Sequence, residues 1–483
     1  MNKILSLAVM SMKQYLLLFF TLTLTGRLSA QQRIFEEPVG WRGRTIELHT
    51  ISDRDKQQNC LFLFNSDSIR IYLLDNRSKT IHHYFLQRAF AEKLLGGYIK
   101  DGKIYAYLHV ENGEPHIHGW TIDIASGKGE DYYIPFEMKH ERLVDRISCG
   151  DHFLYFTVNK KTSEFILYDF RDGKNYDTWR YRFEDGIWKA LTVSAGLSRD
   201  INVAKLDQEG EPSVEIAEKP NKIYLVRDTL YLLMNKDERG VTDIFSFDLL
   251  NRQVGVRKIL HNDVSGFDPP LAEYTDNSIL LDGKLYFVSA TSDSLCVQVR
   301  DFGNGELLRQ YTAGRDEEIP FKNTPIIQEG NVFAGNTSRE LGKTRQLVRK
   351  MLNGSAVISA GRDDSGRIAL SVGSYTKMSS GGGGGGGMWM GGPGGAAAPM
   401  VFVPSGGFYR STWTKSARFG MLLDSSTLQH VSGEMPLSIN EKIENYTTGI
   451  TIPSEGENLF MNDGNYIYAY YNRDERKLLL IRF

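Results

Sequence analysis

The sequence predicts an all-β protein built from a repeated unit, and two observations indicate this. Asp101-Gly-Lys-Ile-Tyr105 recurs as Asp282-Gly-Lys-Leu-Tyr286, with looser copies at Asp151–Tyr155, Asp228–Tyr231 and Asp463–Tyr468. Recurrence at a period of about 50 residues is typical of a repeated supersecondary unit. Aromatic residues make up 11% of the chain, with 24 Tyr, 25 Phe and 6 Trp. Such side chains suit the half-buried surface of a pleated sheet.

The composition is that of a globular protein. The chain has 483 residues, of which 41% are hydrophobic and 24% charged. Length alone is compatible with about two to four domains, but the repeat favours a single array. The formal net charge is −2, so no overall basic field attracts nucleic acid.

Residues 1–30 resemble an export signal. Two lysines in Met1–Lys13 precede the apolar run Tyr15–Thr25, and Leu28-Ser-Ala30 supplies small residues before Gln31. These are the three regions of a cleavable signal peptide. Met12 is an alternative start. An uncleaved membrane anchor is the other interpretation, although the run is shorter than the roughly 20 residues that a spanning helix needs. We therefore predict an exported protein, periplasmic or extracellular, with no transmembrane span in the mature chain.

One unit can be followed strand by strand. Ile104–Val110 is expected to be a strand, Glu111–Glu114 a turn, His116–Asp123 a second strand, Ala125–Lys128 a turn and Asp131–Ile134 a third strand. Turn residues between alternating runs are the hairpin signature.

Further copies of this pattern indicate the architecture. They occupy Leu61–Asp75, Phe153–Phe170, Leu230–Asp248 and Leu285–Asp301, with a degenerate copy at Ala190–Ala217. Units of three or four antiparallel strands repeated radially are the blades of a β-propeller. We predict a single β-propeller over residues 45–483, with seven or eight blades according to the degenerate copy, after an N-terminal extension at 31–44. Two β-sandwich domains are the alternative, but no Pro- and Gly-rich linker divides the chain.

The last unit lacks an outer strand. Ile467–Tyr471 and Leu478–Phe483 form its expected hairpin, and Thr45–Thr50 is a strand with no assigned partner. We predict that Ile46–Thr50 pairs with Leu478–Phe483.

One helix is predicted over Thr337–Leu352. Thr337 and Glu340 have the spacing of a capping box, and Gly354 follows the expected end. One face of this helix carries the basic residues Arg339, Lys343, Arg345 and Arg349. This face fits either an anion-binding or docking helix, or a solvated polar face.

A glycine-rich insertion is predicted at 379–407 within one blade. It includes Gly381–Gly387 and lacks the side chains to bury a core, so it is expected to be flexible. Met388, Trp389 and Met390 are the candidate binding residues, because they form an apolar tip that could touch a partner or a membrane. The alternative is a low-complexity expansion with no role.

Motifs that carry chemistry are scarce. The sequence has no G-x-S-x-G, H-E-x-x-H, Walker or dinucleotide-binding pattern. His116 and His118 share a strand face but lack a third metal ligand nearby, so exposed strand histidines explain them better. Asp363-Asp-Ser-Gly366 is expected to be a turn rather than a calcium loop. We predict no metal site and no cofactor, and catalytic residues remain unknown.

Three cysteines, Cys60, Cys149 and Cys296, are an odd number for an exported chain. Buried thiols acting as small hydrophobic residues are the main expectation, with one disulfide as the alternative.

The Asp-Gly-Lys turns and outer turns such as Asp123–Lys128 resemble the blades of secreted bacterial β-propellers of the quinoprotein-like and TolB-like kind, over most of residues 45–483. The Trp docking motif of quinoproteins is missing. The Leu28-Ser-Ala-Gln31 end of the signal is similar to exported proteins of Bacteroidota. This resemblance implies a fold and a compartment but no activity.

Two functions follow as hypotheses. The first is a monomeric, non-enzymatic scaffold that binds a protein or glycan of the cell envelope through one rim. The rim opposite the Asp-Gly-Lys turns is expected to act, because its turns vary most. The second is a hydrolase or lyase with acidic residues around the central channel. Acidic residues with raised pKa values in the channel would favour the enzyme, and a plugged channel would favour binding.

Overall fold

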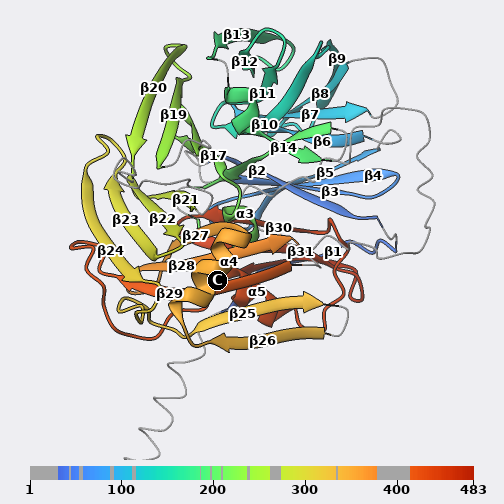
Figure 1. Cartoon of the computed structure of the whole chain (residues 1–483). Helices are drawn as coiled ribbons and strands as arrows, with labels where there is room; N and C mark the ends of the chain where they lie inside the picture. The colour runs from blue at the N-terminus through green and yellow to red at the C-terminus, as the bar shows by residue number, and fades with distance from the viewer. Residues whose placement is uncertain are drawn as a thin grey trace, which may run out of the picture.

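The computed structural model is mostly β, with repeated antiparallel sheets in a β-propeller-like arrangement (Figure 1). It describes residues 31–42, 45–53, 58–87, 92–110, 116–184, 186–195, 198–207, 210–235, 240–261, 274–332, 335–377 and 414–483. The predicted signal peptide and the whole of the predicted glycine-rich insertion at 379–407 lie outside these residues.

Four of the described sheets are each made of four strands that follow one another in the chain. Their strands are β2 (Glu47–Asp53), β3 (Gln58–Phe64), β4 (Ser68–Leu74) and β5 (Thr80–Gln87); β6 (Glu92–Lys100), β7 (Lys103–Val110), β8 (His116–Asp123) and β9 (Gly129–Pro135); β10 (Glu141–Cys149), β11 (His152–Asn159), β12 (Glu164–Phe170) and β13 (Tyr176–Arg182); and β21 (Tyr274–Leu281), β22 (Lys284–Thr291), β23 (Ser294–Asp301) and β24 (Leu307–Gly314).

The repeated Asp-Gly phrase is the tight turn between the first two strands of a sheet. Asp101 and Gly102 have φ values of 49° and 72°, and Asp282 and Gly283 have 50° and 68°. Positive φ at both central residues is the type I′ geometry that matches the twist of a hairpin. The phrase therefore recurs because the same turn opens successive sheets, as the sequence predicts.

Three further sheets depart from this plan. One contains β16 (Val203–Leu206), β17 (Asn221–Val226), β18 (Thr229–Asn235), β19 (Val241–Asp248) and β20 (Gln253–Leu260), with β16 parallel to β17. The second runs in the order β26 (Gly335–Leu341), β25 (Ile326–Val332), β29 (Thr414–Leu423), β28 (Ile368–Lys377), β27 (Ser355–Arg362). The third runs in the order β1 (Gln32–Pro38), β32 (Lys477–Arg482), β31 (Asn465–Asn472), β30 (Glu457–Asn462).

The predicted pairing of Ile46–Thr50 with Leu478–Phe483 is wrong. The strand beside β32 is Gln32–Pro38, whereas Glu47–Asp53 pairs with β3 as the first strand of its own sheet. Lys477 and Glu36 form a cross-strand ion pair at 2.5 Å in the observed sheet. Residues expected to be an N-terminal extension thus complete the last sheet.

The degenerate copy at Ala190–Ala217 does not form a four-stranded sheet. It contains the hairpin β14 (Thr192–Ala195) and β15 (Ser198–Ile201), then β16 and the helical turn α3 (Val214–Ala217). A short helix, α2 (Ile187–Leu191), precedes them. This segment is not a repeat of the unit, because only its strand β16 joins a larger sheet, in parallel to β17.

The helix prediction is correct only in its second half. Helix α4 spans Thr344–Asn353 and ends at Gly354, but Thr337 and Glu340 lie in strand β26. Pairing with β25 overrides the local capping pattern in that stretch. A capping box does occur at α5 (Ile439–Thr447), where Ser438 and Glu441 cap the helix. The described residues therefore contain more helices than the one that the sequence predicts.

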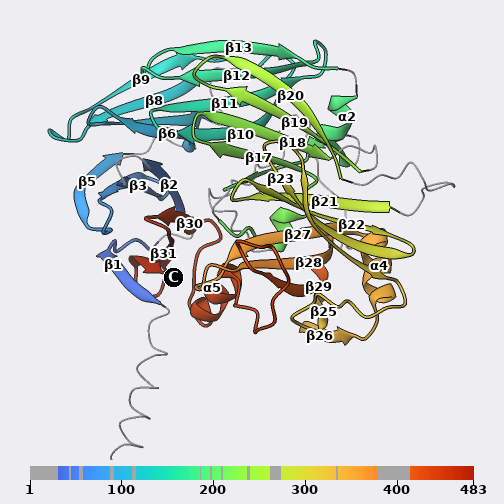
Figure 2. The same ribbon diagram turned by 90° about the vertical axis from the view of Figure 1, so that its left-hand side faces the viewer.

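Apolar side chains between successive sheets form the core. Buried clusters join β2–β5 to β6–β9, β6–β9 to β10–β13, and β10–β13 to β16–β20. Another joins β16–β20, β21–β24 and β25–β29, and a further one joins the β1–β32 sheet to β2–β5. No buried apolar cluster of described residues combines the β25–β29 sheet with the β1–β32 sheet. Helix α5 lies between those two sheets (Figure 2).

Candidate functional site

The binding residues predicted from the sequence, Met388, Trp389 and Met390, lie outside the described residues. Their insertion joins β28 to β29, the second and third strands in the hairpin order of their sheet. The placement of this insertion on the rim opposite the Asp-Gly turns stays a prediction.

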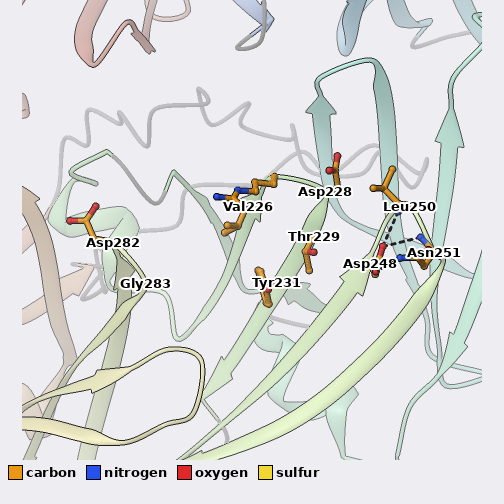
Figure 3. A pocket seen from close by; sticks show the side chains of 10 residues that line it. Val226, Asp228, Thr229, Tyr231, Asp248, Leu250, Asn251, Asp282 and Gly283 are labelled. Carbon is orange, nitrogen blue, oxygen red and sulfur yellow. Dashed lines mark hydrogen bonds between the residues drawn. The ribbon is translucent and has the colours of Figure 1, made fainter.

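An open pocket of about 630 Å³ lies on the rim that carries the Asp-Gly turns. Three turns line it, at residues 226–229, 248–251 and 282–283 (Figure 3). They connect β17 to β18, β19 to β20, and β21 to β22. The pocket is therefore shared by two adjacent sheets, on the rim opposite the one expected from the sequence to bind a partner.

Charge in this pocket is mainly negative. Three lining residues are carboxylates, Asp228, Asp248 and Asp282, against a single lining guanidinium, Arg227. Hydrogen bonds from the backbone and side-chain amides of Asn251 hold the pKa of Asp248 below its usual range.

The remaining walls of the pocket combine a charge pair with apolar surface. Asp282 also pairs with Arg362 at 2.7 Å. Leu250, which is 64% exposed, and Tyr231 add apolar surface. A pocket of this kind can hold a polar or cationic group beside an apolar one.

A second pocket of about 400 Å³ lies beside strand β5. Its lining includes His82, His83 and the exposed ring of Phe85, together with the turn at 125–127 of the neighbouring sheet. His83 stacks on Tyr72 with a centroid separation of 4.6 Å. Burial lowers the pKa of His83, so its ring favours the neutral form.

His116 and His118 do not form a metal site in the described structure. His118 is buried, accepts a hydrogen bond from Trp120 Nε1 at 3.0 Å and stacks on Tyr133. The expectation that both are exposed is thus wrong for His118. Among the described residues, no group of three His, Cys, Asp or Glu side chains could hold a metal ion.

Two other sequence expectations can be placed. Asp363 caps a turn, because its Oδ1 accepts hydrogen bonds from Ser365 N, Ser365 Oγ and Arg367 N. The three cysteines are free thiols; Cys60 and Cys149 are buried in strands, and Cys296 is partly exposed. Burial raises the pKa of Cys296 to about 11, so it stays protonated at neutral pH.

Residues 203–207 and 210–222, hereafter the central segment, contact four sheets besides the one that contains β16 and β17. Lys205 Nζ donates to Arg146 O on β10 at 3.2 Å. Ser359 Oγ on β27 donates to Pro212 O at 2.7 Å. The remaining contacts run to Asn277 on β21 and to Tyr466 on β31. The segment therefore lies where the inner strands of these sheets converge.

Asn277 is the hub of one buried polar network. Its Nδ2 donates to Ala217 O, Glu218 O and Ala356 O at 3.1, 2.9 and 2.8 Å, and its Oδ1 accepts from Lys222 Nζ. Asn277 and Lys222 are 1% and 0% exposed. Burial lowers the pKa of Lys222 to about 7, against the opposing charges of Glu218 and Asp276.

A second polar group, the half-buried Glu211, lies between the β25–β29 and β1–β32 sheets. Its Oε2 accepts from Ile439 N at the start of α5 at 3.2 Å, and its backbone N–H donates to the Tyr466 hydroxyl. A Cβ at Gly361 would lie 2.9 Å from the Cβ of Glu211, so glycine leaves room for it. Burial raises the pKa of Glu211 to about 7, and Ile439 N–H opposes this.

Neither the pocket nor the central segment was identified from the sequence. Asp228 and Asp282 both lie in copies of the repeated turn. Because these copies look like all the others in sequence, nothing indicated that the two turns line one pocket. The central segment carried one signal, its poor match to the repeat.

No protein-family model and no curated protein matches the chain. Solved structures to which the chain is similar include the WD40 domain of SCAP from fission yeast, at 9% identity over 93% of this chain and 98% of that chain, with a TM-score of 0.31. Kluyveromyces lactis Hsv2 is similar at 12% identity over 68% and 73%, with a TM-score of 0.30. A Synechocystis apocarotenoid oxygenase mutant is similar at 8% identity over 62% and 65%, with a TM-score of 0.28. Scores this low carry no argument, and the fold rests on the strand order above.

Proposed function

We propose that the chain is an exported, non-enzymatic β-propeller that binds a protein or glycan of the cell envelope through its rim. In this proposal the seven sheets of four or five strands are seven blades, and β1 supplies the outer strand of the last. Support comes from the apolar clusters that join successive sheets.

The observation that carries this proposal is the position of the central segment. In a propeller enzyme that works through its channel, the inner strands would line an accessible path. Here the central segment hydrogen-bonds to four other sheets where such a path would run. The open pocket lies instead on the rim. Concave sites with a few convergent polar groups are the usual places for ligand binding.

Export is supported by residues 1–30, with the charged, apolar and small-residue regions of a signal peptide. No helix among the described residues is long and apolar enough to span a membrane. Fractionation of cells that express the tagged chain tests export: we expect the processed protein in the periplasm or medium.

Site-specific cross-linking tests rim binding. A photo-reactive residue at Leu250, in the pocket, should give discrete adducts with an envelope protein or glycan in intact cells. The matched control is Leu437, which is 54% exposed and lies outside the pocket. Asp228→Asn in the Leu250 background should reduce the adducts. Equal labelling from both positions, unchanged by Asp228→Asn, would contradict rim binding.

A hydrolase or lyase is the second candidate, and the raised pKa of Glu211 favours it. A carboxyl group that titrates near neutral pH can act as a general acid or base. Purified protein should be assayed with chromogenic glycosides, esters and uronic-acid polymers. Turnover that Glu211→Gln abolishes and Glu215→Gln preserves would establish the enzyme and displace the binding scaffold.

A further inference from the structure

Strand β20 is an edge strand with a regular ladder. It is the last strand of its sheet, and its eight residues pair with β19 without a register shift. Among the other outer strands, β1, β5 and β24 have an irregular register with their neighbours, whereas β9, β13 and β26 are as regular as β20. Irregular edges discourage pairing with another chain, so β20 lacks one common protection. Figure 1 shows β20 at the periphery of the molecule.

The outward donors of β20 follow from one hydrogen bond. His261 N donates to Gly240 O at 2.8 Å, so the N–H of this residue points toward β19. Because inward and outward N–H groups alternate along a strand, the N–H groups that point away from β19 are those of Val254, Val256, Lys258 and Leu260. Four donors thus lie on an edge that no other described strand covers.

The two faces of β20 differ. Arg257 stacks over Phe302 at 4.5 Å and donates to Gly303 O at 3.0 Å, so this face packs on the β21–β24 sheet. The other face carries Val256, 47% exposed, Lys258, and Leu260, 67% exposed. Leu260 is the most exposed large apolar side chain of the described residues.

We propose that β20 is a docking edge for an extended peptide of a protein partner, which adds to the sheet as an antiparallel strand. The proposal rests on the binding-scaffold function and names its partner class. Side chains directly opposite one another on one face determine strand pairing. The peptide opposite Val256, Lys258 and Leu260 therefore has the pattern apolar, any residue, acidic, any residue, apolar.

The charge of Lys258 and the outward backbone N–H groups of β20 favour a peptide strand over other occupants of this edge. An added strand satisfies the outward N–H groups by backbone carbonyls, which a flat apolar partner cannot do. Lys258 lies opposite Asp243 on β19, and on its free side the exposed ammonium between two apolar side chains favours an acidic residue at one defined position. The competing explanation is that Lys258 guards the edge against aggregation, in which case no strand docks.

A charge swap tests the proposal with two synthetic decapeptides. One has Val-Thr-Glu-Thr-Val at its centre and the other Val-Thr-Lys-Thr-Val, both acetylated, amidated and fluorescently labelled. Anisotropy titrations should show that the full-length protein binds the acidic peptide about fivefold more tightly than the basic one. Lys258→Glu should reverse this preference.

Backbone pairing is tested separately. Lys258→Pro removes an outward N–H without removing a bond to β19, and edge strands tolerate such a proline. It should abolish binding of the acidic peptide, and hydrogen exchange should show that peptide protects the amides of Val256 and Leu260. Thr312→Pro is the matched control, because Arg315 N donates to Asp293 O and the Thr312 N–H therefore points outward on β24.

Two outcomes would overturn the docking edge: no binding of either peptide at about 1 mM, or a preference that Lys258→Glu leaves unchanged. Either result leaves the rim cross-links from Leu250 as an independent test of the binding scaffold. Loss of those cross-links with peptide binding intact would overturn the scaffold's rim site and retain the edge.

Discussion

Two junctions between sheets are built in opposite ways. Between β6–β9 and β10–β13, Tyr107 packs against Phe153 and Phe170 with centroid separations of 5.2 and 4.9 Å inside a buried apolar cluster, and the ion pairs Lys100–Asp151 and Lys174–Glu130 lie at its edges. We call this the aromatic junction. Between β25–β29 and β1–β32, helix α5 intervenes, Arg418 contacts Glu441 at 3.3 Å, and Glu211 caps Ile439. We call this the polar junction.

The difference has physical consequences. Apolar burial contributes stability that depends on area and shape and is independent of pH. A buried polar junction depends on each partner, because removing one leaves the other desolvated and unpaired. The aromatic junction should therefore be stronger and insensitive to pH, and the polar junction weaker and adjustable.

The largest expected effect is at the aromatic junction. Phe153 is 0% exposed, and Phe153→Ala should lower the free energy of unfolding by about 4 kcal/mol through lost contacts and a cavity. The loss should be the same at pH 6 and pH 8 in urea titrations. Phe85→Ala, at a ring that is 63% exposed, is the control and should change stability little. A loss that depends on pH would undermine the contrast.

Arg418 should contribute less to stability at the polar junction than Phe153 contributes at the aromatic junction. The charges of Glu329 and Glu441 raise the pKa of Arg418 although burial opposes them, and the side chain is 23% exposed. Arg418→Met should cost about 2 kcal/mol, because two carboxylates lose their partner. Arg315→Met, at an exposed pair, should cost less than about 0.5 kcal/mol. Equal costs for the two variants would remove the special role of the junction.

Glu211 should make the polar junction sensitive to pH. Its folded-state pKa of about 7 lies above the ordinary 4.5, so the folded protein holds a proton that the unfolded chain releases between these values. This contribution is complete below about pH 4.5 and is lost as pH rises through 7.

Thermal unfolding measures this effect. The wild-type protein should lose about 1.4 kcal/mol more between pH 6 and pH 8 than Glu211→Gln does. Glu215→Gln, in the same segment, should follow the wild type. Parallel curves for wild type and Glu211→Gln would show that Glu211 does not titrate in this range.

The smallest effect is expected at the cap of α5. Ser438 Oγ accepts a hydrogen bond from Glu441 N at 3.2 Å. Ser438→Ala should cost roughly 1 kcal/mol, and Ser438→Asn should restore part of it. Circular dichroism with urea would measure both. A neutral Ser438→Ala would mean that packing alone positions the helix.

The sequence predicts the repeat well because each strand carries its own alternation and each Asp-Gly turn its own conformation. It fails where pairing is not local. Gln32–Pro38 pairs with Lys477–Arg482, and Ile326–Val332 pairs with Thr414–Leu423, so nothing near either strand in sequence reports that partner. Glu211 and Asn277 have no distinguishing pattern in the sequence, because their contacts come from sheets that are distant in the chain. The binding tip at 388–390 stays a prediction.

The pairing of β1 with β32 also sets a time scale. Gln32 pairs with Arg482, about 450 positions later in the chain. At roughly 5–20 residues per second, the ribosome delivers the second strand some 20–90 s after the first. Closing so long a loop adds little free energy, since each doubling costs only about 0.6 kcal/mol. During that interval Gln32–Pro38 has no partner strand. Its unpaired backbone and apolar side chains are then available to a chaperone, before the final sheet can assemble.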